Sequence, residues 1–402
     1  MGFLKRLLST IGIFSQWRRE PRHVEVFRPE GIRTVNFRLN WHALERHRRD
    51  WVKFVEELSP APPLNEESRG IVICGGGVCF LTCAWVNIRI LRHHGCTLPI
   101  ELWHLENEIT DELAQELQQL GVECRNLNHI VLINKDPLTR SPKNYAMKPF
   151  CILHSRFARI LYLDADNVAV ADPTYLFDHE IFKAQGAVFW PDFWRTDVQN
   201  PIWNLINDRT YSMSEQDSGQ LLVDKSRCWR ELNLCAYFNK QAQLYYRLLH
   251  YDKDTFKFAW LALKSPFFMV PFGPGSCGHI TQDGVFIGNT MVQYDYSGKI
   301  IFLHRNIIKW DITRNDEILW QELRKFKPNA RCKEYHLGKL TKSGDTGMDL
   351  RGDIEIVNIR EMFPDLELLC LKFLRELRES PAYARFIISR YITRFRGEIV
   401  RP

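Results

Sequence analysis

Residues 159–167 read Arg-Ile-Leu-Tyr-Leu-Asp-Ala-Asp-Asn, an apolar run that ends in two carboxylates one residue apart. The run predicts a buried β-strand over residues 158–163. In an extended chain, residues i and i+2 point to the same side, so Asp164 and Asp166 can face one cation. Oxygen ligands of this kind suit Mn²⁺ or Mg²⁺, which also bind substrate phosphates. A strand-end turn or a helix cap is the alternative interpretation of this pattern.

The sequence on both sides of this run alternates between short apolar stretches and helical patterns. Strands that alternate with helices predict an α/β fold with a parallel sheet. In such sheets, ligands bind beyond the carboxyl ends of the strands. Besides residues 158–163, the predicted strands are 71–74, 99–105, 122–127, 187–190, 218–224 and a hairpin of 291–294 with 299–304; the predicted helices are 41–58, 78–94, 110–120, 146–157, 228–239, 241–251, 255–264, 365–379 and 382–396.

Two further motifs carry residues that suit a diphosphate site. The stretch Ile300-Ile-Phe-Leu-His304 predicts a strand that ends in an imidazole, and Lys309 follows five residues later. His304 can complete a metal site with Asp164 and Asp166, and Lys309 can hold a diphosphate as a point charge. The glycine run 75–77 follows the first strand and suits a backbone that approaches a nucleotide. A capped strand end, a solvated lysine and a plain turn are the structural alternatives.

Composition and charge exclude several classes of protein. The chain has 402 residues, with 45% hydrophobic and 25% charged residues, which excludes wholesale disorder and fibrous structure. The net charge of +6 is concentrated at the two ends, because residues 1–23 and 385–402 each hold five basic residues and one acidic residue. The segment between them is faintly acidic, which argues against nucleic acid as a partner. The basic ends flank apolar stretches, so peripheral membrane contact and a solvated helix face remain alternatives there.

The sequence divides into three predicted regions. Residues 1–65 form a basic segment and a helix, residues 66–315 form the catalytic domain, and residues 316–402 form a helical extension. The proline-rich stretch 59–63 separates the first two. No stretch reaches the roughly 20 apolar residues that a membrane-spanning helix needs. The cysteines form no CxxC pair, and several, such as Cys74 and Cys370, sit in apolar runs that predict burial.

These motifs resemble those of the fungal α-mannosyltransferases of glycosyltransferase family 71, which have the GT-A fold. The resemblance extends over about residues 70–310, and the matching motifs follow one another in the same order as in the family. It rests on Leu91-Arg-His-His-Gly95, Leu98-Pro-Ile-Glu-Leu-Trp-His104, Met147-Lys148, His154-Ser-Arg-Phe157, Leu161-Tyr-Leu-Asp-Ala-Asp-Asn167, Asp217-Ser-Gly-Gln220, Asp252-Lys-Asp-Thr-Phe256 and Phe302-Leu-His304 with Lys309.

The resemblance implies a GT-A sheet with flanking helices and a role for each matching residue. Asp164, Asp166 and His304 are implied as the metal ligands. The implied donor-binding residues are Gly75, Gly76, Lys148, Arg156 and Lys309, and the implied catalytic carboxylates are Asp217, Asp252 and Asp254. Independently of the resemblance, an aromatic cluster could stack on acceptor sugars, although most of it is expected in the core because aromatic residues dominate burial. Its members are Phe189, Trp190, Phe193, Trp194 and Trp203, and Asp192 beside it is a candidate for the acceptor site.

The expected activity is that of a metal-dependent retaining glycosyltransferase. The resemblance implies transfer of mannose from GDP-mannose to a glycan or glycoprotein in α linkage, with Mn²⁺ or Mg²⁺ as cofactor. No carboxylate stands out as a covalent nucleophile, which favours attack on the same face as the departing phosphate. The alternatives are a retaining transferase that uses a UDP-sugar and a silent carbohydrate-binding protein. The resemblance implies a membrane-associated Golgi protein with a luminal catalytic domain. The sequence shows no stretch that predicts the membrane anchor of the family, so a soluble cytoplasmic or a peripheral membrane location is the alternative.

Overall fold

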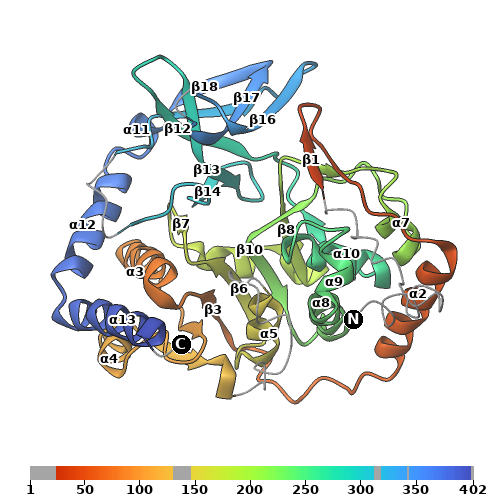
Figure 1. Ribbon diagram of the computed structural model, residues 1–402, viewed down its shortest axis with the longest axis horizontal. Coiled ribbons are helices and arrows are strands. Elements are labelled where there is room, and N and C mark those ends of the chain that lie inside the picture. The colour runs from red at the N-terminus through yellow and green to blue at the C-terminus, as the bar shows by residue number, and fades with distance from the viewer. Residues whose placement is uncertain (1–23, 130–145, 312–317, 342–343, 400–402) are drawn as a thin grey trace, which may run out of the picture.

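The computed structural model describes residues 24–129, 146–311, 318–341 and 344–399 (Figure 1). Its centre is a sheet with the strand order β11-β8-β10-β6-β3-β4-β5. Strands β5, β4, β3 and β6 are parallel, and β10 runs antiparallel between β6 and β8. The strands of this sheet are β3 (Arg69–Cys74), β4 (Ile100–His104), β5 (Val122–Asn126), β6 (Arg159–Asp164), β8 (Ala187–Pro191), β10 (Gln216–Asp224) and β11 (Phe268–Met269).

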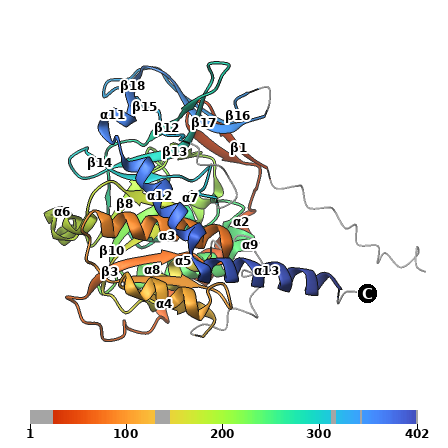
Figure 2. The ribbon, with the colours of Figure 1, turned by 90° about the vertical axis from the view of Figure 1, so that its left-hand side faces the viewer.

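The predicted α/β fold class is confirmed, because parallel strands alternate with helices that cover both faces of this sheet (Figures 1 and 2). Helices α3 and α12 pack on one face, and α5, α8 and α10 pack on the other. Cys370 is buried in α12 as predicted, whereas Cys74 at the end of β3 is only partly buried. The helices are α2 (Trp41–Glu56), α3 (Gly77–His93), α4 (Asp111–Gln119), α5 (Met147–His154), α6 (Glu180–Gln185), α7 (Pro201–Ile206), α8 (Trp229–Lys240), α9 (Ala242–Tyr245), α10 (Lys253–Leu263), α11 (Ile359–Met362), α12 (Leu366–Glu379) and α13 (Pro381–Ile399).

A second, antiparallel sheet joins the first at the two carboxylates. It has the order β18-β15-β12-β13-β14-β7, and it contains the predicted hairpin as β13 and β14. Strand β6 ends at Asp164 in the first sheet, and β7 begins at Asn167 in the second. Residues 165–166 therefore connect the two sheets. The strands are β7 (Asn167–Ala169), β12 (Gly275–Ile280), β13 (Phe286–Tyr294), β14 (Ile300–His304), β15 (Glu322–Phe326) and β18 (Ile354–Asn358).

The segment before residue 66 packs against the body of the protein. Strands β1 (Glu25–Arg28) and β2 (Ile32–Val35) form a hairpin, and β2 pairs with β9 (Arg195–Thr196). Helix α2 begins where predicted, because the side chain of Asn40 accepts a hydrogen bond from the backbone N–H of Ala43 at 2.8 Å. Residues 1–23 lie outside the described residues, so the basic segment predicted there stays a prediction.

The segment after residue 315 corrects the prediction of a helical extension. Strands β15 and β18 complete the second sheet, and β16 (Lys333–Lys339) and β17 (Thr346–Gly352) form a further hairpin before the helices begin. Charged residues interrupt the apolar pattern of these strands, and their pairing with distant strands overrides the weak local signal. Helix α13 projects from the body (Figure 2). Among the described residues, no helix combines the length and hydrophobicity needed to cross a bilayer.

Candidate functional site

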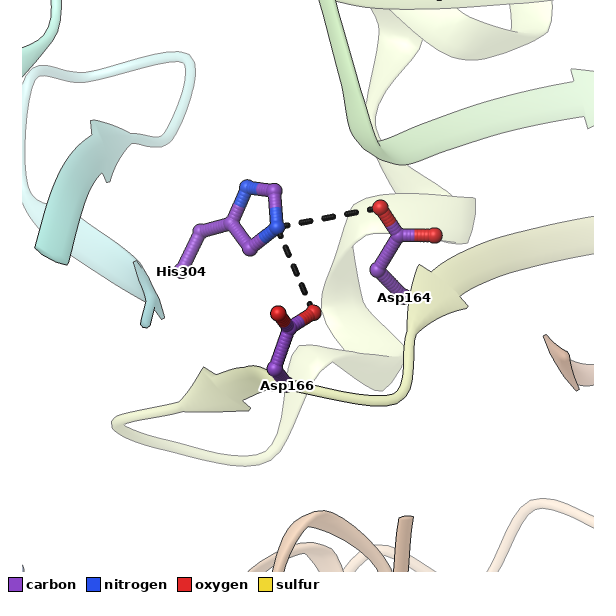
Figure 3. Close-up of side chains that lie close together, drawn as sticks. All are labelled: Asp164, Asp166 and His304. Carbon is purple, nitrogen blue, oxygen red and sulfur yellow. Dashed lines mark ion pairs between the residues drawn. The ribbon is translucent and has the colours of Figure 1, made fainter. Parts of the chain in front are cut away.

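Asp164, Asp166 and His304 meet at the junction of the two sheets (Figure 3). Asp164 is the last residue of β6 and His304 is the last residue of β14, while Asp166 lies in the connection to β7. Pairing of β14 with β7 places His304 opposite Asn167, one residue after Asp166. His304 Nε2 lies 3.4 Å from Asp166 Oδ1 and 3.7 Å from Asp164 Oδ2. Two stretches of the chain that are far apart in sequence, one with Asp164 and Asp166 and the other with His304, therefore converge on one point.

This donor set fits a divalent cation. One candidate ligand atom from each residue can be chosen so that all lie within 4.8 Å of one another. Two ligand atoms that each lie about 2.1 Å from one ion are roughly 3.0–3.6 Å apart at ordinary bond angles. The two separations measured from His304 Nε2 are close to that range. Two carboxylates and one imidazole are a set that Mn²⁺ and Mg²⁺ accept, and Asp166 and His304 are buried, which excludes bulk water from their side.

Two lysines approach the carboxylates. Lys148, in the first turn of α5, lies 3.0 Å from Asp164 Oδ2 and 3.2 Å from Asp252 Oδ2. Burial alone would lower the pKa of Lys148, but the two carboxylates outweigh it and raise the pKa, so the side chain is charged. Lys309 Nζ contacts Asp166, and the same ammonium lies 5.5 Å from the ring centroid of Phe80. Positive charge is thus concentrated at the two carboxylates of the candidate metal site.

Asp217 lies behind His304 and orients its ring. Its carboxylate is 3.4 Å from His304 Nδ1, and it accepts hydrogen bonds from the backbone N–H of Gly219 at 3.0 Å and from the side chains of Gln220 and Gln293. Burial would raise the pKa of Asp217, but His304 and these donors lower it below its usual value. A carboxylate that holds one ring nitrogen leaves the other directed at a metal. Gly219 also makes room for this ring, because a Cβ there would overlap the imidazole.

The other two predicted carboxylates have different surroundings. Asp252 lines the cleft and pairs with Lys148, and its burial raises its pKa despite that lysine. Asp254 does not line the cleft. It is fully buried, accepts a hydrogen bond from the backbone N–H of Gln216 at 3.0 Å, and pairs with Lys253 at 3.1 Å. The structure therefore brings Asp252, but not Asp254, to the site.

Among the predicted donor-binding residues, Gly75 and Gly76 line the cleft with Lys148 and Lys309, whereas Arg156 lies elsewhere. Arg156 pairs with Glu123 at 2.5 Å, and its side chain is half exposed. Helix α5 explains the difference, because its eight residues span about 12 Å. Its first turn reaches the carboxyl end of β6, and the chain after its last turn returns to the start of that strand. Arg156 thus lies near the amino end of β6, whereas Asp164 lies at its carboxyl end.

The site lies in a cleft of about 540 Å³. One half of this cleft surrounds the candidate metal site. The other, termed the second half, was predicted from the sequence only in part. Phe193, Trp194 and Asp192 line that half as predicted for an acceptor site, whereas Phe189, Trp190 and Trp203 belong to the hydrophobic core. The residues that sequence reasoning missed come from β1, the turn before α10, the second sheet and the β16–β17 hairpin. They are Phe27, His250, Tyr251, Ser276, Thr290, Met291, Ile307, Leu337 and Met348.

A buried network of charges supports this second half, and no local signal in the sequence indicates it. Arg33 of β2 is fully buried; its Nε donates to Glu215 at 2.6 Å and its Nη1 to Glu25 at 2.9 Å. Glu215 also pairs with Lys253 at 2.7 Å, and Lys253 pairs with Asp192 at 2.9 Å. The guanidinium of Arg33 thus connects the N-terminal hairpin to the carboxylate in the wall of the cleft.

Comparison with known proteins shows similarity to mannosyltransferases. A family model described as "Mannosyltransferase putative" (Mannosyl_trans3) matches residues 68–216 and 206–295. The α-1,2-mannosyltransferase MNN23 of Candida albicans is 25% identical over 68% of this chain and 53% of its own length. The α-1,2-mannosyltransferase MNN5 of Saccharomyces cerevisiae is 27% identical over 57% of this chain and 49% of its own length. The chain spans about half the length of the curated relatives it matches.

Solved structures with some likeness to this chain are also glycosyltransferases. The bifunctional glycosyltransferase WbbM has a TM-score of 0.39 and 14% identity, covering 53% of this chain and 40% of its own. The galactosyltransferase LgtC has a TM-score of 0.35 and 15% identity, covering 50% of this chain and 73% of its own.

Proposed function

Because the chain belongs to the Mannosyl_trans3 family of mannosyltransferases, we propose that it is a metal-dependent retaining glycosyltransferase. It transfers mannose from GDP-mannose to a hydroxyl group of a glycan or glycoprotein in α linkage. The family membership confirms the predicted resemblance to the fungal α-mannosyltransferases. The names of the curated relatives support mannose as the sugar and α-1,2 as the linkage.

The observation that carries the proposal is the convergence of Asp164, Asp166 and His304 with two lysines at one point of the cleft. A nucleotide-sugar donor has a diphosphate that gains negative charge as it leaves. A bound Mn²⁺ or Mg²⁺ supplies positive charge that offsets it. Lys148 and Lys309 add two ammonium groups beside the same carboxylates, and such prearranged charge is commonly the largest contribution to catalysis.

In the proposed reaction, the bond between the anomeric carbon of mannose and the diphosphate oxygen breaks. A bond from that carbon to the acceptor oxygen forms on the same face, and the proton of the acceptor hydroxyl passes to the departing phosphate oxygen. The products are GDP and the mannosylated acceptor. Three carboxylates of the cleft support this route, because each already has a side-chain partner: Asp192 has the ammonium of Lys253, Asp217 has the imidazole of His304, and Asp252 has the ammonium of Lys148. None of these three is placed as a separate covalent nucleophile.

A donor panel tests the proposal. The purified chain is incubated with GDP-mannose, UDP-glucose or UDP-galactose in Mn²⁺ or in EDTA, and nucleotide release is measured with and without an α-mannoside acceptor. We expect release from GDP-mannose in Mn²⁺ only, with a loss of about 100-fold or more in Asp164→Asn and Asp166→Asn. Asp178→Asn is the matched control, because Asp178 is exposed and pairs with Arg69 away from the cleft.

Each alternative has its own outcome. Preference for a UDP-sugar would contradict the assignment of GDP-mannose as donor, but it would not contradict the metal site. Full activity in EDTA, or in Asp164→Asn, would contradict the metal site. Absence of Mn²⁺ binding by calorimetry together with no turnover of any donor would favour a silent carbohydrate-binding protein.

A further inference from the structure

Resting on the function proposed above, we propose that the second half of the cleft binds a hexose-terminated glycan as acceptor. Tyr251 stacks against the terminal sugar ring, and Asp192 accepts a hydrogen bond from one of its hydroxyl groups. The evidence comes from the backbone at Tyr251, from the chemistry of the surrounding wall and from the origin of the segments that build it.

Tyr251 has a backbone conformation that an aromatic residue rarely adopts. Its φ is +53°, in the left-handed region, where a side chain is strained. Such strain persists only where the surroundings impose it, and it is concentrated at functional sites. Here the residue on each side is held by a distant side chain: His250 Nδ1 lies within hydrogen-bond distance of Glu25 at 2.8 Å, and Asp252 forms an ion pair with Lys148 at 3.2 Å.

This conformation keeps a large aromatic ring at the surface of the cleft. Tyr251 is 47% exposed, although most large aromatic residues of the described chain are buried. Its ring contacts with His250 and Tyr246 are both T-shaped, with centroids 5.0 Å and 5.8 Å away. Asp252, the next residue, pairs with Lys148 in the half of the cleft that surrounds the candidate metal site, termed the donor half. Tyr251 therefore stands where the donor half and the second half meet.

The wall around Tyr251 combines an aromatic surface with a carboxylate. Phe27 packs against Trp194 at 4.9 Å and against His250 at 5.3 Å. Asp192 is nearly buried beside them and is held by Lys253 at 2.9 Å. The apolar C–H face of a pyranose suits aromatic rings, and its hydroxyls suit a carboxylate. A sugar hydroxyl can donate a further hydrogen bond to this carboxylate and a lipid chain cannot, which favours a sugar as the occupant.

Much of this wall comes from outside residues 68–295, which the family model matches. Phe27 belongs to β1, Ile307 follows β14, and Leu337 and Met348 belong to the β16–β17 hairpin. The metal-binding carboxylates and Lys148, by contrast, lie within the matched region. The wall proposed for the acceptor thus combines Tyr251 and Asp192, which lie within the matched region, with Phe27, Leu337 and Met348 from outside it.

The test measures acceptor and donor recognition separately in two variants of Tyr251. Glycine adopts a positive φ without strain, so Tyr251→Gly keeps the backbone and removes the ring. We expect the KM for α-1,2-mannobiose to rise about tenfold relative to the KM for GDP-mannose, as loss of one stacking contact predicts. Tyr251→Phe retains the ring and should stay within about twofold of the unmodified chain. Lys264→Gly is the matched control, because Lys264 has a φ of +55° and lies outside the cleft.

A binding measurement keeps this result separate from the proposed function. The chain is titrated with α-1,2-mannobiose in the presence of GDP and Mn²⁺, and tryptophan fluorescence is recorded, since Trp194 lies in the wall. Saturable binding that weakens in Tyr251→Gly but not in Lys264→Gly supports the proposal, even where no donor in the panel is turned over. Equal affinity in Tyr251→Gly and the unmodified chain, or no binding to either, overturns it.

Discussion

Gly219 shows how one missing side chain determines the geometry of the candidate metal site. The imidazole of His304 occupies the space that a Cβ on Gly219 would need, while the backbone N–H of the same glycine donates to Asp217. Glycine is used here for a close approach and not for a turn, because its φ does not lie in the left-handed region. The position therefore controls both the ring and the carboxylate that orients it.

Gly219→Ala should weaken metal binding without removing a ligand. The added methyl group displaces the imidazole of His304, and a displaced ligand commonly costs about 10–100-fold in metal affinity. The affinity is measured by calorimetric titration with Mn²⁺. Gly273→Ala is the control, because a Cβ at Gly273 meets nothing within 4 Å. Equal Mn²⁺ affinity in both variants would show that His304 is not a ligand.

At the scale of elements, the N-terminal hairpin is joined to the cleft by a buried guanidinium. Arg33 of β2 is fully buried and binds Glu215 and Glu25, and its Nη2 also donates to the backbone carbonyl of Leu248 at 3.2 Å. Burial would lower the pKa of Arg33, but the carboxylates outweigh it and raise the pKa. The hairpin is consequently part of the folded body that supports Asp192 and Tyr251.

Arg33→Met should destabilise the protein strongly, because Glu215 would stay buried without its main partner. Removal of one member of a buried ion pair costs about 3–5 kcal/mol of the free energy of unfolding. Urea denaturation measures the change. Arg28→Met, in the exposed part of the same hairpin, should change the free energy of unfolding by about 0.5 kcal/mol or less.

A double variant checks the cause of that loss. In Arg33→Met with Glu215→Gln, the uncompensated charge is removed, so the double variant should be more stable than Arg33→Met alone. A double variant that is less stable by the sum of both single losses would contradict the assignment of the effect to a buried charge.

The sequence predicted the elements whose signal is local. The apolar run that ends at Asp164 predicts β6, and the side-chain cap at Asn40 predicts the start of α2. Strands β15–β18 were missed because their residues alternate with charges and are stabilised by pairing with distant strands. The same limit applies to the site. Arg33 acts through Glu215 and Leu248, which lie far away in the sequence, and nothing in its immediate neighbours indicates those partners.

At the scale of the whole molecule, the candidate metal site is the junction of the two main sheets. Asp164 belongs to the first sheet and His304 to the second, and the chain passes between the sheets through residues 165–166. An ion bound by both residues would connect the sheets by ligand bonds in addition to this short segment. The stability of the folded chain should then depend on the metal.

Mn²⁺ should therefore raise the melting temperature. At a concentration 100 times its dissociation constant, it should raise the free energy of unfolding by about 2.7 kcal/mol. Amide hydrogen exchange should slow in β7 and β14, whereas β16 and β17 should exchange at the same rate as in EDTA. Asp164→Asn should show neither effect. Slower exchange in β16 and β17 to the same degree as in β14 would contradict a local connection between the sheets.

The meeting of β1 with the β16–β17 hairpin has a consequence for the order of folding. The backbone N–H of Tyr335 donates to the carbonyl of Pro29 at 2.8 Å, so residues more than 300 positions apart pair directly. During synthesis, residues 25–35 emerge early and must wait for residues 333–352 before this contact forms. Contacts of such high sequence separation form slowly, because the intervening chain must first be brought together. The carboxylates of the candidate site can thus be in place on the ribosome before the wall beside Phe27 is complete, and a newly made chain would gain the proposed acceptor surface last.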